Sequence, residues 1–292
     1  MSAGWRHSPA ALIQKGLYLA VVAAGVVIFG FPLFWMVRGA LISQALWLKV
    51  PLVWVPSLND LSLDAFRQIF ASTEFRMATV LLNTLLIALL TSALNVMYNC
   101  MAGFALAKMR FPGKNIILPA LFITLMVPME SMMISLYLII TNAGLANTLA
   151  GIIFPMSAGA FGIILMWRFF ATVPDEIIEA AIIDGADWGA ILFKIAMPLA
   201  TPAIATIAVL SFLGGWESFL WPMIITDPQS RFDVLQKVIA NATLASGGGG
   251  TMMTQWPYLM AAALVSSVPV IVLFLAGQKY FVSGLSTGSV KG

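Results

Sequence analysis

The acidic residues of this 292-residue chain are few and unevenly placed. Five of the twelve Asp and Glu residues fall within residues 168–198, and Glu130 and Glu217 lie alone inside long apolar stretches. Carboxylates accept charge-assisted hydrogen bonds from basic partners and ordinary ones from hydroxyl groups. The first group therefore suits contact with another protein, and the two isolated acids suit contact with a hydroxyl-rich solute.

Residues 168–198 predict two consecutive short helices. Thr172 is expected to cap the first helix and Pro174 to occupy its first turn. Gly185 is a natural stop. A second helix over residues 188–196 then leads to a proline.

The first of these helices is predicted to offer one face to a partner protein. Small Ala side chains allow a close approach to the backbone, and the acids offer charge-assisted bonds. The alternative is a plain re-entrant or interfacial helix pair. The residues expected along the docking face are Ile177, Ala180, Ala181 and Asp184.

Helix-breaking residues surround the two isolated acids. Pro128 precedes Glu130, and Gly214, Gly215 and Pro222 flank Glu217. Breakers beside acids indicate irregular helix that lines a water-accessible path. Alternatively, the acids tie helices together and Trp221 belongs to an interfacial aromatic belt. The predicted pathway residues are Glu130, Trp216, Glu217, Phe219 and Trp221.

The composition excludes a water-soluble globule. Hydrophobic residues make up 61% of the chain and charged residues 9%, with a mean hydropathy of +0.97, whereas soluble domains are about a quarter charged. The scattered net charge of +3 predicts no nucleic-acid partner. Cys100 is the single cysteine and His7 the single histidine, so no disulfide and no metal site are expected. An all-α integral membrane protein is predicted.

Uncharged runs of the length needed to cross a bilayer predict six spans, since about 20 apolar residues are required. Residues 115–167 are too long for one crossing and are divided by a turn at 141–144. The first uncharged run, residues 16–37, is longer than the apolar core of a signal peptide and lacks a small-residue cleavage site, so it predicts a retained helix. The other spans are 77–107, 202–225 (interrupted by Glu217) and 257–277.

Basic residues predict that both termini lie in the cytoplasm. Nine Lys and Arg residues then fall on the inner side and six on the outer side, and residues 108–114 carry three bases and no acid. We therefore divide the chain into two parts. Residues 1–76 hold the tail, the first span and the outer loop, and residues 77–292 form a five-helix core with the loop 168–198. Within the outer loop, residues 62–70 predict an amphipathic helix on the bilayer surface or, alternatively, an ordinary packed helix.

The pattern E-A-A-x2-D-G-A-x8-I-x2-P begins at Glu179 and ends at Pro198. It resembles the EAA loop of the membrane-spanning permease subunits of bacterial ABC importers. Residues 215–222 and 278–285 resemble two further segments of the carbohydrate-uptake branch, so the resemblance covers 77–292 firmly. Glu217 stands where that branch usually has Asn, and Met197 where it usually has Leu.

The resemblance implies a type I importer permease fold in a bacterial inner membrane, for uptake of a sugar, oligosaccharide or related polyol. Its implied partners are a second homologous permease subunit, two ATPase subunits that hold ATP and Mg, an extracytoplasmic solute-binding protein and the lipid bilayer. The loop would dock on the ATPase and switch the bundle by alternating access. The implied coupling residues are Glu176, Glu179, Ala180, Ala181, Asp184, Gly185, Ala186, Ile195 and Pro198.

This chain is not expected to be an enzyme or to hold a cofactor. Gly113-Lys114 is followed by Asn115, and Lys108 stands where a phosphate-binding loop needs Gly. A membrane enzyme would want His/Asp or Ser/Lys pairs within the spans, and none is present. The alternative function is a self-contained secondary transporter, which predicts an ion relay and usually inverted repeats.

Overall fold

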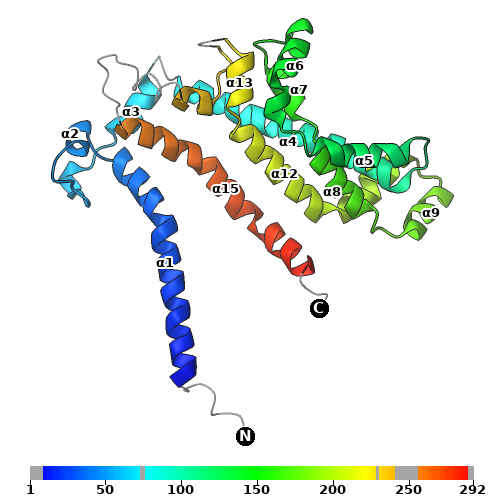
Figure 1. Cartoon of the computed structure of the whole chain (residues 1–292), viewed down its shortest axis with the longest axis horizontal. Helices are drawn as coiled ribbons and strands as arrows, with labels where there is room; N and C mark the ends of the chain where they lie inside the picture. The colour runs from blue at the N-terminus through cyan, green and yellow to red at the C-terminus, as the bar shows by residue number, and fades with distance from the viewer. Residues whose placement is uncertain (1–8, 73–75, 228–229, 241–255, 289–292) are drawn as a thin grey trace. The chain divides into compact units, whose positions relative to one another are not determined.

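The computed structural model describes residues 9–72, 76–227, 230–240 and 256–288, and all regular secondary structure in these ranges is helical (Figure 1). His7 and residues 290–292 lie outside them. The chain forms two compact units, one made of residues 1–75 and 242–267 and the other of residues 76–241 and 268–292.

The first unit joins one long apolar helix to a short helical cap. Arg38, near the end of the long helix, donates from Nε and Nη2 to the carbonyl oxygen of Val53, at 3.0 and 2.6 Å. This guanidinium also lies over the ring of Trp35. The helices are α1 (Pro9–Ala40), α2 (Gln44–Trp47), a 3-10 turn (Leu58–Asp60), α3 (Asp64–Ala71) and the first turns of α15 (Trp256–Gly288).

Helix α3 confirms the helix predicted over residues 62–70. Its buried side chains are Ala65 and Ile69, while Leu63 and Phe70 are exposed. Phe66, which was expected on the same face as the two exposed residues, is half-buried, so this apolar face is only partly exposed. Its place on the bilayer surface stays a prediction.

The second unit is built around α4 (Met77–Lys108), which packs along α8 and α12. Glycine allows α4 and α8 to approach closely, because a Cβ at Gly103 would lie 2.5 Å from the Cβ of Met166. Close contact through small residues is how helices pack in membranes. The other helices are α5 (Lys114–Thr124), α6 (Met129–Asn142), α7 (Leu149–Met156), α8 (Ala160–Phe170), α9 (Asp175–Ile183), α10 (Trp188–Ile191), α11 (Met197–Leu199), α12 (Thr201–Trp216) and α13 (Leu220–Ile225).

Within the described ranges, three helices are long and apolar enough to cross a membrane, and the number of candidate spans rises to six if each of three bent helix pairs is one span. The single helices are 13–40, 77–108 and 256–277. The pairs α5–α6, α7–α8 and 188–199 with α12 bend by 109°, 47° and 86°. Helix α6 ends at Asn142, which confirms the predicted turn, and residues 217–219 interrupt the fifth predicted span. The sharpest bend lies between Thr124 and Met129, where irregular helix was predicted beside Pro128, whose ring lacks an N–H donor.

Two buried hydrophobic clusters lie along α4, one near each end. One cluster contains Ile87 and Trp221 and joins α4 to α6, α7 and α13. The other contains Phe104 and joins α4 to α8, α9 and the segment 188–207. Ile87 and Phe104 are 17 residues apart on one helix, or about 26 Å at 1.5 Å per residue. This separation approaches the ~30 Å thickness of the hydrocarbon layer.

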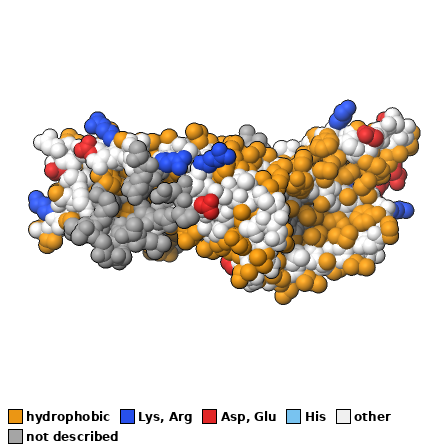
Figure 2. Space-filling model, turned by 90° about the horizontal axis from the view of Figure 1, so that it is seen from above, with side chains coloured by type: hydrophobic (Ala, Val, Ile, Leu, Met, Phe, Trp, Pro, Cys, Tyr) orange, Lys and Arg blue, Asp and Glu red, His pale blue; other side chains and the backbone are white. Residues whose placement is uncertain are grey.

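Much of the surface is apolar. Figure 2 shows extensive hydrophobic surface on which charged side chains are few and scattered. Ile134 and Ile183 are about four-fifths exposed or more, at 78% and 85%. Such a surface suits lipid and partner subunits better than water.

Candidate coupling site

Helix α9 begins at Asp175 without a side-chain cap. Pro174 was predicted in the first turn but occupies the N-cap position, one residue before the helix. The prediction that Thr172 caps this helix is wrong, because its hydroxyl donates to the carbonyl oxygen of Phe169 at 2.7 Å. The same carbonyl accepts the Thr172 N–H at 3.0 Å, so Thr172 bonds back to the last turn of α8, three residues before it, and does not reach α9.

The end of α9 confirms the predicted stop at Gly185. Its φ of +84° lies in the left-handed region that favours glycine. The Gly185 N–H bonds to the Ile182 carbonyl at 3.0 Å, and the Ala186 N–H bonds to the Ala181 carbonyl at 2.9 Å. This pair of bonds is a Schellman motif. It satisfies two carbonyls of the last turn and turns the chain toward the next helix.

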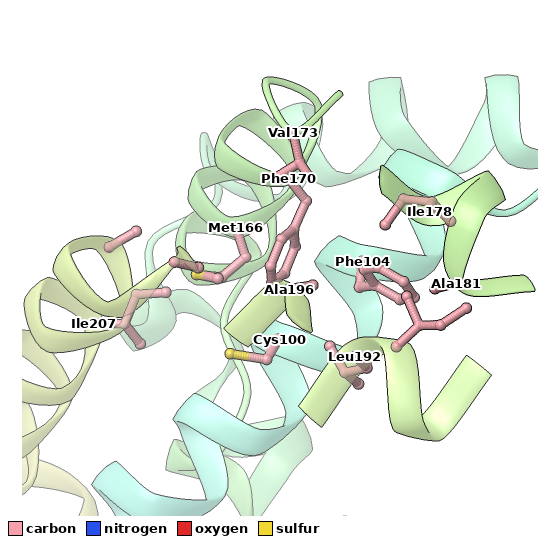
Figure 3. Packing of buried hydrophobic residues seen from close by; sticks show 13 residues of the cluster. Cys100, Phe104, Met166, Phe170, Val173, Ile178, Ala181, Leu192, Ala196 and Ile207 are labelled. Atoms are coloured by element: carbon pink, nitrogen blue, oxygen red, sulfur yellow. The ribbon is translucent and has the colours of Figure 1, made fainter. Parts of the chain in front are cut away.

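One face of α9 is anchored in the protein core. Figure 3 shows the side chains of Ile178 and Ala181 pointing toward Phe104 of α4. Both are buried in the cluster that also holds Phe170, whose ring meets that of Phe104 edge to face at 5.6 Å. Ala181 was expected on the docking face, but it faces inward. The helix is short, and its inner positions must fill the space beside Phe104.

The opposite face of α9 is exposed and carries acids beside small and apolar residues. Residues at spacings of three, four, seven and eight share one side of a helix. Ile177, also predicted on this helix's docking face, is 40% exposed. The exposed positions that satisfy this spacing are Glu176, Glu179, Ala180, Ile183 and Asp184.

The second short helix continues further than predicted, to Leu199. Asp187 caps its start, since Oδ1 accepts from the Ala190 N–H at 2.9 Å. An Asp just before an apolar run was a readable signal for this cap. Residues 192–196 form a π-helical turn, because Pro198 cannot donate to the carbonyl four residues earlier.

The coupling residues of this second segment are divided between core and surface. Ala186 and Ile195 pack against the buried cluster around Phe104. Pro198 is exposed. Of the nine predicted coupling residues, the exposed ones are Glu176, Glu179, Ala180, Asp184, Gly185 and Pro198.

Lys108, one of the three bases predicted to mark a cytoplasmic loop, anchors the start of α9. Its Nζ atom donates to the Val173 carbonyl at 2.5 Å and to Asp175 Oδ1 at 2.6 Å. The hydrogen bond and charge of Lys108 lower the pKa of Asp175 below its ordinary value. No local pattern pointed to this contact, because the two residues are 67 positions apart.

The predicted pathway residues do not share one environment. Trp216 and Trp221 are each 2% exposed. Trp221 donates from Nε1 to the Gly151 carbonyl at 3.0 Å, and Trp216 stacks on Phe212. Both indoles thus pack inside the protein and do not face an open route, because burial removes the large apolar area of their rings from solvent.

The two acids of the predicted pathway are exposed, each beside an interruption in a helix. Glu130 lies in the first turn of α6, after the bend at Pro128, and Glu217 follows the last residue of α12. Phe219 is half-buried. The irregular backbone predicted beside both acids is confirmed.

Residues 99–287 match the family described as "binding-protein-dependent transport system inner membrane component". The chain belongs to this family. It is a multi-pass inner membrane permease. The matched range contains α9, the buried cluster that anchors it and the second short helix, residues 188–199.

This inner membrane component is similar along most of its length to curated permeases. The arabinooligosaccharides transport system permease protein AraQ of Halalkalibacterium halodurans is 32% identical to it, and the match covers 83% of this chain and 84% of AraQ. The sn-glycerol-3-phosphate transport system permease protein UgpE of Salmonella typhi is 31% identical to it, and the match covers 93% of this chain and 97% of UgpE. A chain of the crystal structure of a bacterial ABC transporter for import of the acidic polysaccharide alginate matches its fold with a TM-score of 0.80, at 22% identity, over 94% and 99% of the two chains.

Proposed function

We propose that this inner membrane component is one transmembrane half of an ATP-driven importer and that α9 transmits force to it from a separate ATPase. The observation that carries the proposal is the two-sided character of α9. Ile178 and Ala181 anchor one face beside Phe104, while acids and Ala180 occupy the exposed face. A helix held this way can transmit displacement to α4.

The chemistry of the exposed face suits a basic groove on a partner. Glu176, Glu179 and Asp184 can accept charge-assisted bonds from Arg or Lys, and Ala180 lets the partner approach the helix backbone. In the assembly that we propose, this chain pairs with a second homologous permease subunit. Two ATPase subunits bind ATP and Mg on the cytoplasmic side, and an extracytoplasmic binding protein delivers the solute.

The proposed solute is a sugar, an oligosaccharide or a related polyol. Relatives about 30% identical to this chain carry the names of arabinooligosaccharide and sn-glycerol-3-phosphate transport systems. These solutes share several hydroxyl groups. Within the membrane, exposed carboxylates at Glu130 and Glu217 are the groups that we propose to meet such hydroxyls.

The experiment is co-purification from the native membrane followed by transport in proteoliposomes. We expect the tagged chain to bring down an ATPase subunit, and ATP to drive uptake only when a loaded binding protein is present. Binding proteins loaded with different sugars then identify the solute, by which one stimulates ATP hydrolysis. Uptake driven by an ion gradient, with no ATPase in the purified assembly, would contradict the proposal.

A further inference from the structure

A small polar cavity lies in the first unit, between α2, α3 and the first turn of α15. Its volume is about 140 Å³, or roughly five water molecules at about 30 Å³ each. Ligand pockets for larger molecules measure about 300–1,000 Å³. The cavity therefore has room for one monosaccharide ring rather than for an oligosaccharide.

The walls of the cavity carry hydroxyl, amide and carboxylate groups. No lining residue is basic, and the guanidinium of Arg67 is paired with the lining carboxylate of Asp64 at 3.5 Å. A phosphate or a uronate carboxylate would therefore have to compete with Asp64 for that one cation. Amides and carboxylates can pair with neighbouring hydroxyls of a sugar, each through two atoms. The polar lining residues are Ser43, Gln44, Ser62, Asp64, Gln68 and Tyr258.

Local bonds hold several of these groups in place. The Tyr258 hydroxyl donates to Oε1 of Gln68, which joins α15 to α3. Ser43 Oγ accepts from the Leu46 N–H and caps α2, and Ser62 Oγ accepts from the Asp64 N–H. Such fixed groups bind a ligand without first having to be ordered.

The cavity also has an apolar side. Pro257 and the ring of Tyr258 line it, and flat apolar surfaces of this kind pack against the C–H face of a sugar. Beside it, the indoles of Trp47 and Trp256 stack with their centroids 5.9 Å apart. Trp256 directly precedes the lining residue Pro257, and Trp47 lies three residues after Gln44, so this pair can serve as a spectroscopic reporter.

We propose that this cavity is an outer subsite that binds one neutral sugar ring. The proposal rests on the carbohydrate-importer function proposed above. With the predicted orientation, the end of the first span and the start of the sixth lie on the extracytoplasmic side, which is where solute arrives. The subsite thus selects a neutral ring over an anionic one.

The test uses the full assembled complex in lipid nanodiscs without a binding protein. Arabinose, glucose, glucuronate and glycerol 3-phosphate are titrated while tryptophan fluorescence is recorded. We expect a saturable change with the two neutral sugars and none with the two anions. The double variant Gln44→Met with Asp64→Leu replaces two polar partners by apolar side chains of similar size, and it should weaken sugar binding at least tenfold.

The matched control is Gln236→Met, which makes the same replacement in the other unit. It should bind the neutral sugars as the wild type does. The subsite alone would be overturned if the wild-type complex imports a sugar with its binding protein and the double variant binds neutral sugars as tightly as the wild type does. Equal or tighter binding of the anions would also overturn it. Absence of any sugar import by the wild-type complex would instead overturn the proposed function.

Discussion

The Nζ atom of Lys108 lies 2.6 Å from Oδ1 of Asp175 and joins the last residue of α4 to the first residue of α9. The lysine side chain is 6% exposed, and it also bonds to the Val173 carbonyl. The start of α9 is thus fixed to the central helix of its unit. In the function that we propose, displacement of α9 acts on α4 through this contact.

Replacing Lys108 should uncouple ATP hydrolysis from transport. Lys108→Met keeps the length of the side chain and leaves the buried Val173 carbonyl without its partner, which costs about 1–3 kcal/mol. We expect uptake per ATP hydrolysed to fall several-fold while the complex still assembles. Arg110→Gln removes a neighbouring exposed charge and serves as the control. Equal uptake per ATP in the Lys108→Met variant and the wild type would show that the contact transmits nothing.

The Lys108–Asp175 contact should make a pH-dependent contribution to stability. Lys108 lowers the pKa of Asp175 in the folded state, so the contribution is fully present above the ordinary aspartate pKa of about 3.9. It is lost as pH falls through the lower folded value. The melting temperatures of wild type and Asp175→Asn should differ by a constant amount from neutral pH to about pH 5 and converge below about pH 4. Convergence near neutral pH would contradict this assignment.

Gly185→Val should abolish most uptake while leaving the chain in the membrane. A Cβ at Gly185 would meet no atom within 4 Å, so the cost comes from the backbone. The left-handed conformation costs an L-residue about 1–2 kcal/mol, and more with a β-branch. Gly185→Asn, which tolerates this conformation, should retain most activity. Unchanged uptake by the valine variant would remove Gly185 from the coupling path.

Gly103→Ala should destabilise the packing of α4 on α8. The added Cβ would lie 2.7 Å from the backbone nitrogen of Trp167, and backbone cannot move aside cheaply. Overpacking of this kind costs about 1–3 kcal/mol. Gly214→Ala, with no atom within 4 Å, is the matched control. Thermal unfolding in detergent measures both, and similar melting temperatures would show that α8 adjusts.

Trp221→Phe should lower stability rather than solute affinity. The change removes the buried bond from Nε1 to the Gly151 carbonyl, at a cost of about 1–3 kcal/mol. Trp54→Phe changes an exposed indole and should alter the melting temperature less. A selective change in the apparent affinity for the transported sugar, with unchanged melting, would instead place Trp221 on the solute path.

Much of this architecture follows from local sequence. A chain with 9% charged residues has too few to cover a soluble surface, and uncharged runs of sufficient length predict where its helices cross. Gly185 marks the end of α9, because only local backbone geometry decides that position. The EAA pattern located the candidate coupling loop, and the family match includes it.

The tertiary structure decided which way side chains face. Ala180 and Ala181 are neighbours of one type, yet only Ala181 lies beside Phe104, because α4 covers one side of α9. Trp221 is buried because Gly151 offers a carbonyl 70 residues away, and Lys108 reaches Asp175 across 67 residues. Spacing along the chain determines which residues share a helix. Contacts between helices determine which of them remain free to meet a partner.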